Sequence, residues 1–295
     1  MPNLMIYDNI KKGNLIMKNW YNLILIAVAA ASGYLLAIKD IDDNQYDHFE
    51  KIIANATLID LSHRLEQGMP TGPGPNMETI ETLLSHTPGE GLMEGSGLIH
   101  RYSFPGQWGT HVDAPVHFIK GKRTLEDIPL TEMVLPLIIL DIHQQVSQNP
   151  DYQISMADVI EWEKENGKIP EKSFVALRSD WSKRWPFTNE LRNWDQEGNS
   201  HSPAWSKDVL EFLANSRNIT AIGHETMDTD LGRLAASGQY PLETYFLGLD
   251  KYQIENMKSL DQVPKTGSFI IASWVNSKGG AGFPARVFAI VPQKK

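Results

Sequence analysis

The sequence predicts an α/β protein in which a mixed sheet is flanked by helices. Residues 134–142 are almost all apolar, as expected of a strand that is covered on both faces. Residues 155–166 show the apolar spacing of a helix instead. The same alternation continues downstream, with strand-like segments over 173–177 and 219–222 and a helical segment over 206–215. Alternating strands and helices are typical of an α/β fold.

The first 40 residues differ in character from the rest. Lys18 precedes an apolar run from Leu23 to Ala31, and small residues follow it. This order is typical of a secretory signal peptide, and the run is short for a membrane span, which needs ~20 residues. We therefore expect residues 1–40 to be an N-terminal extension and signal peptide, with a membrane anchor as the alternative. A cleaved signal implies a periplasmic or secreted protein without a stable membrane partner.

A polar linker and a short lead-in helix are expected over residues 41–56. The apolar run over 57–61 then predicts a strand, and Ser62-His63 stand at its end, where functional side chains often emerge. His63 is expected either to line a substrate pocket or to cap a turn. Further along, Ser155 and Asp158 form an imperfect capping box for the helix that Gly167 ends.

The most informative stretch is Gly106–Phe118, which places two histidines and an aspartate within seven residues. In an extended chain, Gln107, His111 and Asp113 point to one face because side chains alternate. Imidazole nitrogen and carboxylate oxygen side by side suit a metal ion. Pro115 should end the strand and turn the chain, so that His117 returns over the pocket as an acid or base. The alternative for this H-x-D pair is a structural hydrogen bond.

Composition excludes several classes of function. The net charge is −9 and no basic cluster interrupts it, which argues against nucleic-acid binding. The chain has no cysteine, and therefore no disulfide, thiolate ligand or cysteine nucleophile. It also lacks the glycine-rich nucleotide motifs and the G-x-S-x-G elbow.

The run G-T-H-V-D-A-P-V-H-F resembles the signature of the metal-dependent cyclase-like hydrolases, a family that includes kynurenine formamidases and isatin hydrolases. Asp60-Leu61-Ser62-His63 upstream, Ile254-Glu255-Asn256 and Gly282–Arg286 downstream support the resemblance. It implies a cyclase-like hydrolase domain over residues 57–292, with the swivelling β/β/α architecture. Gln107 departs from the family pattern, which has a metal-binding histidine at that position.

The resemblance also implies further site residues. Glu255 matches a metal-binding glutamate of the family, whereas Glu243, two residues after Pro241, replaces a histidine. Glu243 can equally be a first-turn glutamate favoured by the helix dipole. For substrate binding we expect Trp181 and Trp185, near a substrate-facing stretch of the family, with ordinary packing as the alternative. His224 follows the strand over 219–222 and is a further substrate-binding candidate.

By resemblance, the expected activity is hydrolysis of an amide, lactam or formamide C–N bond in a small cyclic or aromatic substrate. A metal-activated water would attack, and His117 would carry the proton. The predicted ligands Gln107, His111, Asp113, Glu243 and Glu255 are rich in oxygen, which favours Mn²⁺ over Zn²⁺ without excluding zinc. The alternatives are a lactone hydrolase or cyclase of the same family, and a non-catalytic periplasmic binder. We also expect a homodimer or homotetramer.

Overall fold

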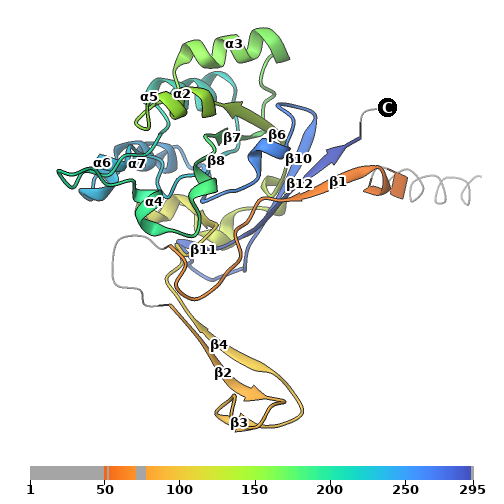
Figure 1. Ribbon diagram of the computed structural model, residues 1–295. Coiled ribbons are helices and arrows are strands. Elements are labelled where there is room, and N and C mark those ends of the chain that lie inside the picture. The colour runs from red at the N-terminus through yellow and green to blue at the C-terminus, as the bar shows by residue number, and fades with distance from the viewer. Residues whose placement is uncertain (1–49, 52, 71–77, 294–295) are drawn as a thin grey trace, which may run out of the picture. The chain divides into compact units, whose positions relative to one another are not determined.

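A computed structural model describes residues 50–51, 53–70 and 78–293 (Figure 1). The chain divides into two compact units, residues 1–55 and 56–295. In the first unit, residues 50–51 and 53–54 are helical. The predicted signal segment lies outside the described residues. Within the described part of the chain, no helix is long and apolar enough to cross a membrane.

The second unit is built on a nine-stranded mixed sheet, which confirms the predicted α/β class. The four strands at its centre run parallel, and the strands on either side of them pair antiparallel. In sheet order the strands are β1 (Ala56–Asp60), β12 (Arg286–Pro292), β10 (Ser268–Ser273), β6 (Val134–Asp141), β7 (Phe174–Arg178), β8 (Ala221–His224), β9 (Tyr252–Glu255), β5 (His111–Asp113) and β11 (Gly282–Pro284).

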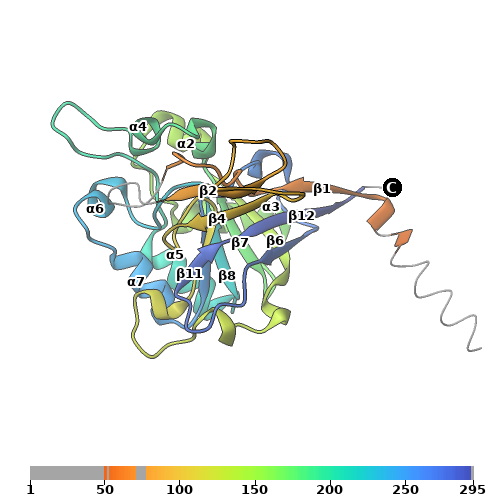
Figure 2. The same ribbon diagram turned by 90° about the horizontal axis from the view of Figure 1, so that it is seen from below.

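Strand β6 is buried on both faces, which explains its almost continuous apolar sequence. Leu137 and Ile139 lie in the core on one side of the sheet, while Ile138 and Leu140 lie in the core on the other. Side chains of a strand alternate between faces, so a strand between two cores has no polar side. The first core is enclosed by the curled sheet, and helices cover the second (Figure 2).

The helices are short and pack mainly on the face of Ile138 and Leu140. They are α2 (His143–Gln148), α3 (Met156–Asn166), α4 (Thr188–Arg192), α5 (Lys207–Glu211, continued by a π-helical turn over Phe212–Ser216), α6 (Gly232–Ala236) and α7 (Pro241–Gly248). The predicted capping box of α3 is complete, because Ser155 and Asp158 each bond the other's backbone N–H. Pro241 opens α7, as expected of a residue without a backbone N–H.

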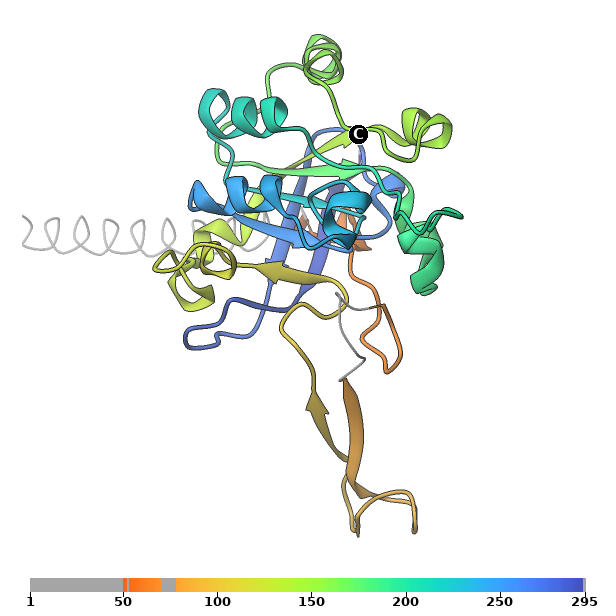
Figure 3. The same cartoon turned by 90° about the vertical axis from the view of Figure 1, so that its left-hand side faces the viewer.

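A separate three-stranded sheet follows the segment 71–77. It consists of β2 (Thr79–Ser85), β3 (Met93–Glu94) and β4 (Ile99–Ser103), in the order β3-β2-β4. Figure 3 shows this small sheet projecting away from the nine-stranded sheet. Soon after β4 the chain reaches Gly106, the first residue of the motif-bearing stretch Gly106–Phe118.

The motif-bearing stretch is less extended than predicted. Strand β5 covers only His111–Asp113, because Gly109 has a φ of +62°, a value that L residues with a side chain rarely adopt. Continuous alternation from Gln107 to Asp113 is therefore wrong for the first half of the stretch. As predicted, the strand ends at a proline: Pro115 starts a 3₁₀ turn that ends at His117.

Candidate metal centre

Three strands bring the polar residues of the motif together. Strand β5 pairs with β9 so that His111 lies opposite Glu255 and Asp113 lies opposite Gln253. Directly opposite residues of an antiparallel pair have neighbouring side chains on the same face. On the other edge, β5 pairs with β11, where Gly282 lies opposite Asp113. The sheet register therefore joins residues that are about 140 positions apart in the sequence.

The centre of the cluster is His111. Its Nε2 lies 3.3 Å from Asp113 Oδ2 and 3.5 Å from Glu255 Oε2. One ligand atom of each of these three side chains lies within 4.8 Å of the others, and all three are buried. This spacing can accommodate one metal ion between them.

The orientation of His111 suits a metal ligand. Its Nδ1 lies 2.8 Å from the Gly109 carbonyl oxygen, to which it can donate a hydrogen bond. The neutral ring then has its lone pair on Nε2, and this buried atom has no hydrogen-bond partner among the described residues. A backbone carbonyl that fixes the tautomer of a ligand is a usual feature of metal sites. The orphaned Nε2 therefore shows that these residues fit a bound cation.

Electrostatics point to competition between a metal and protons. Burial lowers the pKa of His111, but Asp113 and the Gly109 carbonyl outweigh it, so the pKa is raised. Burial raises the pKa of Asp113, yet His111 brings it down to about 2. A divalent cation would replace the proton between them, because metal ligands must be deprotonated.

Two glutamates make the cluster strongly acidic. The pKa values of Glu243 and Glu255 are raised well above the ordinary value, first by burial and then by neighbouring carboxylates. For Glu243, the strongest of these neighbours is Asp113. Carboxylates that repel one another in a buried site favour a bound cation or proton. Glu243 lies in the first turn of α7, where the alternative explanation, a first-turn glutamate favoured by the helix dipole, requires it to be.

Gln253 lies among these carboxylates, and sequence reasoning missed it. Its Nε2 donates to Asp113 at 3.2 Å, to Glu243 at 2.9 Å and to Glu255 at 2.9 Å. Thr229 fixes the amide by donating to its oxygen at 2.7 Å. The available signal was strand alternation, since Gln253 stands two residues before Glu255 and so shares its face.

Asp228 and Asp230 are two further buried acids that the sequence analysis did not select. Asp228 pairs with Arg192 at 3.0 Å. Asp230 accepts hydrogen bonds from the backbone N–H groups of Leu242 and Glu243 at the start of α7. Burial raises the pKa of both carboxyls. Asp230 therefore orients the first turn of α7 and, with it, Glu243, whereas Asp228 is paired with Arg192 of α4.

His117 lies at the edge of the cluster. Its Nε2 is 3.9 Å from Asp113 Oδ1, and its side chain is 28% exposed, far more than that of Asp113. Asp113, His117 and Glu243 form a second set of ligand atoms within 4.8 Å. His117 can therefore either move a proton between the cluster and solvent or help to hold a second cation that shares Asp113.

Gln107 reaches the cluster through Asp113. Its Nε2 donates to Asp113 Oδ1 at 3.2 Å. A side chain at Gly282 would collide with this amide, because a Cβ there would lie 2.2 Å from Gln107 Nε2. The glycine of β11 thus makes room for Gln107, whose contribution to metal binding stays a prediction.

His224 lies behind Glu255. Its Nε2 is 3.4 Å from Glu255 Oε1, and its Nδ1 accepts a hydrogen bond from Trp205 Nε1 at 3.2 Å. Burial lowers its pKa to about 3, so the neutral ring has its hydrogen on Nε2, facing Glu255. The side chain is 2% exposed and supports the cluster from within the fold, which differs from the predicted contact with substrate.

The remaining substrate-binding candidates are placed differently from one another. His63 stacks on Trp185, with ring centroids 4.0 Å apart and planes 13° from parallel. Trp181 is buried, donates to the Leu191 carbonyl and has the Arg184 guanidinium 3.8 Å above its ring. Trp181 is fully engaged in packing. Its position therefore matches ordinary packing, the alternative stated above, better than stacking on a substrate.

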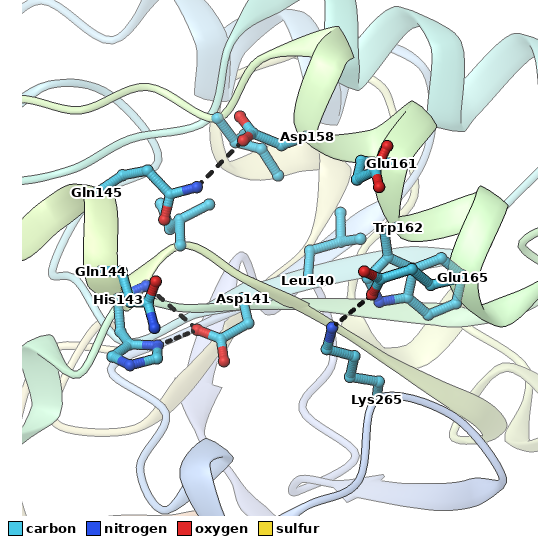
Figure 4. A pocket seen from close by; sticks show the side chains of 12 residues that line it. Leu140, Asp141, His143, Gln144, Gln145, Asp158, Glu161, Trp162, Glu165 and Lys265 are labelled. Carbon is cyan, nitrogen blue, oxygen red and sulfur yellow. Dashed lines mark hydrogen bonds and ion pairs between the residues drawn. The ribbon is translucent and has the colours of Figure 1, made fainter.

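A second acidic region lies between α2 and α3, where a cavity of about 420 Å³ contains Asp141, Asp158 and Glu165 (Figure 4). Its polar groups largely satisfy one another. Gln145 donates to Asp158 at 3.2 Å, and Lys265 donates to Glu165 at 3.0 Å. We call this region the α2–α3 cavity; none of the predicted site residues lines it.

Comparison with protein families identifies a match over residues 59–231 to the Cyclase family, described as "Putative cyclase". Isatin hydrolase of Roseibium aggregatum is 30% identical over 191 residues, which are 63% of this chain and 72% of that protein.

Solved structures show the same fold. Isatin hydrolase A from Labrenzia aggregata, bound to benzyl benzoate, superposes with a TM-score of 0.75 and 30% identity over 85% of this chain and 100% of the other. A potential metal-dependent hydrolase with cyclase activity gives a TM-score of 0.59 at 21% identity, over 81% of this chain and 100% of the other. At that identity the likeness concerns the fold alone.

Proposed function

Since the chain belongs to the Cyclase family, we propose that it is a metal-dependent hydrolase that opens a lactam or cleaves a related amide C–N bond of a small aromatic substrate. The observation that carries the proposal is the buried set of His111, Asp113 and Glu255 around an unsatisfied imidazole nitrogen. The relative that is 30% identical is an isatin hydrolase, and isatin contains such a lactam.

The proposed cation is Mn²⁺, with Zn²⁺ as the alternative. His111, Asp113 and Glu255 would hold it, and Glu243 and His117 would complete the site or hold a second ion. One imidazole among several carboxylates is a donor set that suits a hard cation. When bound, a divalent cation lowers the pKa of a coordinated water from about 16 toward ~7 and polarises a carbonyl oxygen.

The protein's own residues would orient and move protons. Gly109 and Gln253 hold His111 and the carboxylates in place, so little rearrangement is needed during reaction. His117 is within reach of Asp113 and is partly open to solvent, so it can take a proton from the attacking water. It can then return that proton to the nitrogen of the cleaved bond. His224 would keep Glu255 oriented toward His111.

The test is turnover by purified protein that has been stripped of metal with a chelator and then reloaded. Isatin, N-formylkynurenine and an aryl lactone are offered separately with Mn²⁺ and with Zn²⁺, and products are identified by mass. We expect metal-dependent ring opening of isatin and little turnover of the lactone. Hydrolysis of the lactone alone would replace the proposal with a lactonase of the same family.

A non-catalytic binding protein is a second candidate, because the chain has Gln107 and Glu243 where the family pattern that it resembles has histidines. Such a protein would bind isatin with a heat that calorimetry can measure, but it would not hydrolyse isatin with any of the added metals. Catalysis by the Mn²⁺ form that disappears in the variant Asp113→Asn would exclude it.

A further inference from the structure

A second polar cavity, of about 470 Å³, adjoins the strand that carries the metal ligands. Thr110 and Gly109 form part of its wall, immediately before His111. We call it the Lys258 pocket, after the residue that distinguishes it. Its size is sufficient for a small organic molecule.

The charge of this pocket is opposite to that of the protein. Arg64, Lys258 and Arg286 line it with Asp60 as the accompanying carboxylate, in a chain with a net charge of −9. Asp60 is already engaged, by Arg286 at 3.0 Å and by the Ser62 backbone N–H at 3.1 Å. In the part of the chain that the structure describes, no carboxylate forms an ion pair with Lys258.

One wall of the pocket is rigid and has an unmet polar atom. His63 is held by its stack on Trp185 and by its backbone N–H, which donates to Thr110 Oγ1 at 2.8 Å. Its Nε2 is buried without a hydrogen-bond partner among the described residues. Burial, then the charge of Lys258, lowers the pKa of His63 to about 4, so the ring is neutral near pH 7.

The pocket shares its wall with the metal cluster. The Gly109 carbonyl that accepts from His111 Nδ1 also accepts from Asn256 Nδ2 at 3.2 Å. Thr110 Oγ1 donates to the Asn256 carbonyl at 2.6 Å, and Asn256 follows the ligand Glu255. A molecule in the Lys258 pocket would therefore lie one backbone segment away from His111 and Glu255.

We propose that the Lys258 pocket binds the carboxylate group of a small aromatic substrate or product, with Lys258 as the paired cation. That this molecule is a substrate or product of the metal centre rests on the proposed function. The binding itself does not, because Lys258, Arg64 and Arg286 lie outside the cluster. A charged amine that is paired with a carboxylate ligand provides both attraction and orientation.

The test is calorimetric titration of metal-free, full-length protein with benzoate and with benzamide, its neutral counterpart. Removing the metal prevents benzoate from binding there. We expect benzoate to bind at least about tenfold more tightly than benzamide, with an affinity that falls as salt rises. Lys258→Met should weaken benzoate by about tenfold, and Lys258→Arg should retain most of the affinity.

The matched control is Lys265→Met, because Lys265 lies in the α2–α3 cavity and already pairs with Glu165. It should leave benzoate affinity unchanged. Equal affinities for benzoate and benzamide, or an unchanged benzoate affinity in Lys258→Met, would overturn the inference. Isatin has no carboxylate, so metal-dependent hydrolysis of isatin reports on the proposed function separately: loss of one result leaves the other standing.

Discussion

Two aspartate–histidine pairs of this protein have the same residue types two positions apart and opposite surroundings. His111 and Asp113 lie on β5, with side chains that are 3% and 1% exposed. Asp141 and His143 lie at the end of β6 and the start of α2, with side chains that are 18% and 33% exposed. Only the first pair is a candidate metal site.

The difference lies in where each imidazole finds its partner. His143 Nδ1 lies 2.6 Å from Asp141 Oδ1, and Arg178 lies 2.8 Å from the other oxygen, so the carboxylate is fully paired. His111 uses Nδ1 on a backbone carbonyl and leaves Nε2 facing Asp113 and Glu255. A metal site thus arises where the fold leaves negative charge and a lone pair unmatched, which residue spacing alone does not reveal.

The largest expected effect separates the two pairs directly. Asp113→Asn keeps the side chain's size but removes the anion that shares the cation with His111 and Glu255. We expect loss of stoichiometric metal and a fall in kcat/KM of more than about 100-fold, the upper range for changes around metal ligands. Bound metal is measured by elemental analysis, and circular dichroism should show a retained fold.

Asp141→Asn is the matched control, because it makes the same change in the paired carboxylate outside the cluster. It should leave metal content and kcat/KM within about twofold of the wild type. If both variants lost metal equally, the contrast between the regions would fail. Normal turnover by Asp113→Asn would mean that β5 does not contribute to the catalytic site.

Metal removal should expose the unmatched charge as a dependence of stability on pH. The raised pKa values of Glu243, Glu255 and His111 stabilise the folded state at low pH, and this contribution is lost as pH rises through their folded values. His63 and His224 have lowered pKa values, so they make stability rise with pH. This opposite effect is confined to pH values below about 6.5, the pKa of an unperturbed histidine.

Above about pH 6.5, the melting temperature of the chelator-treated protein should therefore fall as pH rises. Saturating Mn²⁺ should flatten this slope, because the cation replaces the protons. Glu255→Gln should reduce the slope without metal. A melting temperature that rises with pH in the metal-free protein would contradict the proposed charge imbalance.

The role of Gln253 sharpens the comparison at a smaller scale. Gln253→Met removes the donor that serves Asp113, Glu243 and Glu255, and leaves carboxylate oxygens unpaired in a buried site. We expect the free energy of unfolding of the metal-free protein to fall by about 1–3 kcal/mol, as measured with urea. Gln145→Met, in the α2–α3 cavity, should cost less than about 1 kcal/mol because its acceptor Asp158 keeps other donors.

The smallest effect concerns the choice of metal. Gln107 and Gln145 each donate to an aspartate at 3.2 Å, one inside the cluster and one outside it. Gln107→His would offer a nitrogen ligand beside Asp113 and should raise zinc affinity relative to manganese by about tenfold. Chelator competition measures the ratio. Gln145→His should leave it unchanged, and so would Gln107→His if residue 107 does not reach the ion.

Sequence by itself determined the local chemistry of this protein. The apolar run of β6, the capping box at Ser155 and the stop at Pro115 follow from local preferences of a few neighbouring residues. His111 and Asp113 are two positions apart in the chain, so strand alternation over three residues predicted that their side chains lie close together.

Only the tertiary structure decided which groups surround that pair. Glu255 and Gln253 reach it through the antiparallel register of β9 against β5, which strand pairing sets and sequence spacing does not. The positive φ of Gly109 interrupts the strand that alternation had predicted to be continuous. The Gly109 carbonyl is then the hydrogen-bond partner of His111 Nδ1. Burial and the pairing of neighbouring charges depend on the packing of distant segments. That packing is why His111 Nε2 lacks a hydrogen-bond partner among the described residues, whereas His143 Nδ1 is paired with Asp141.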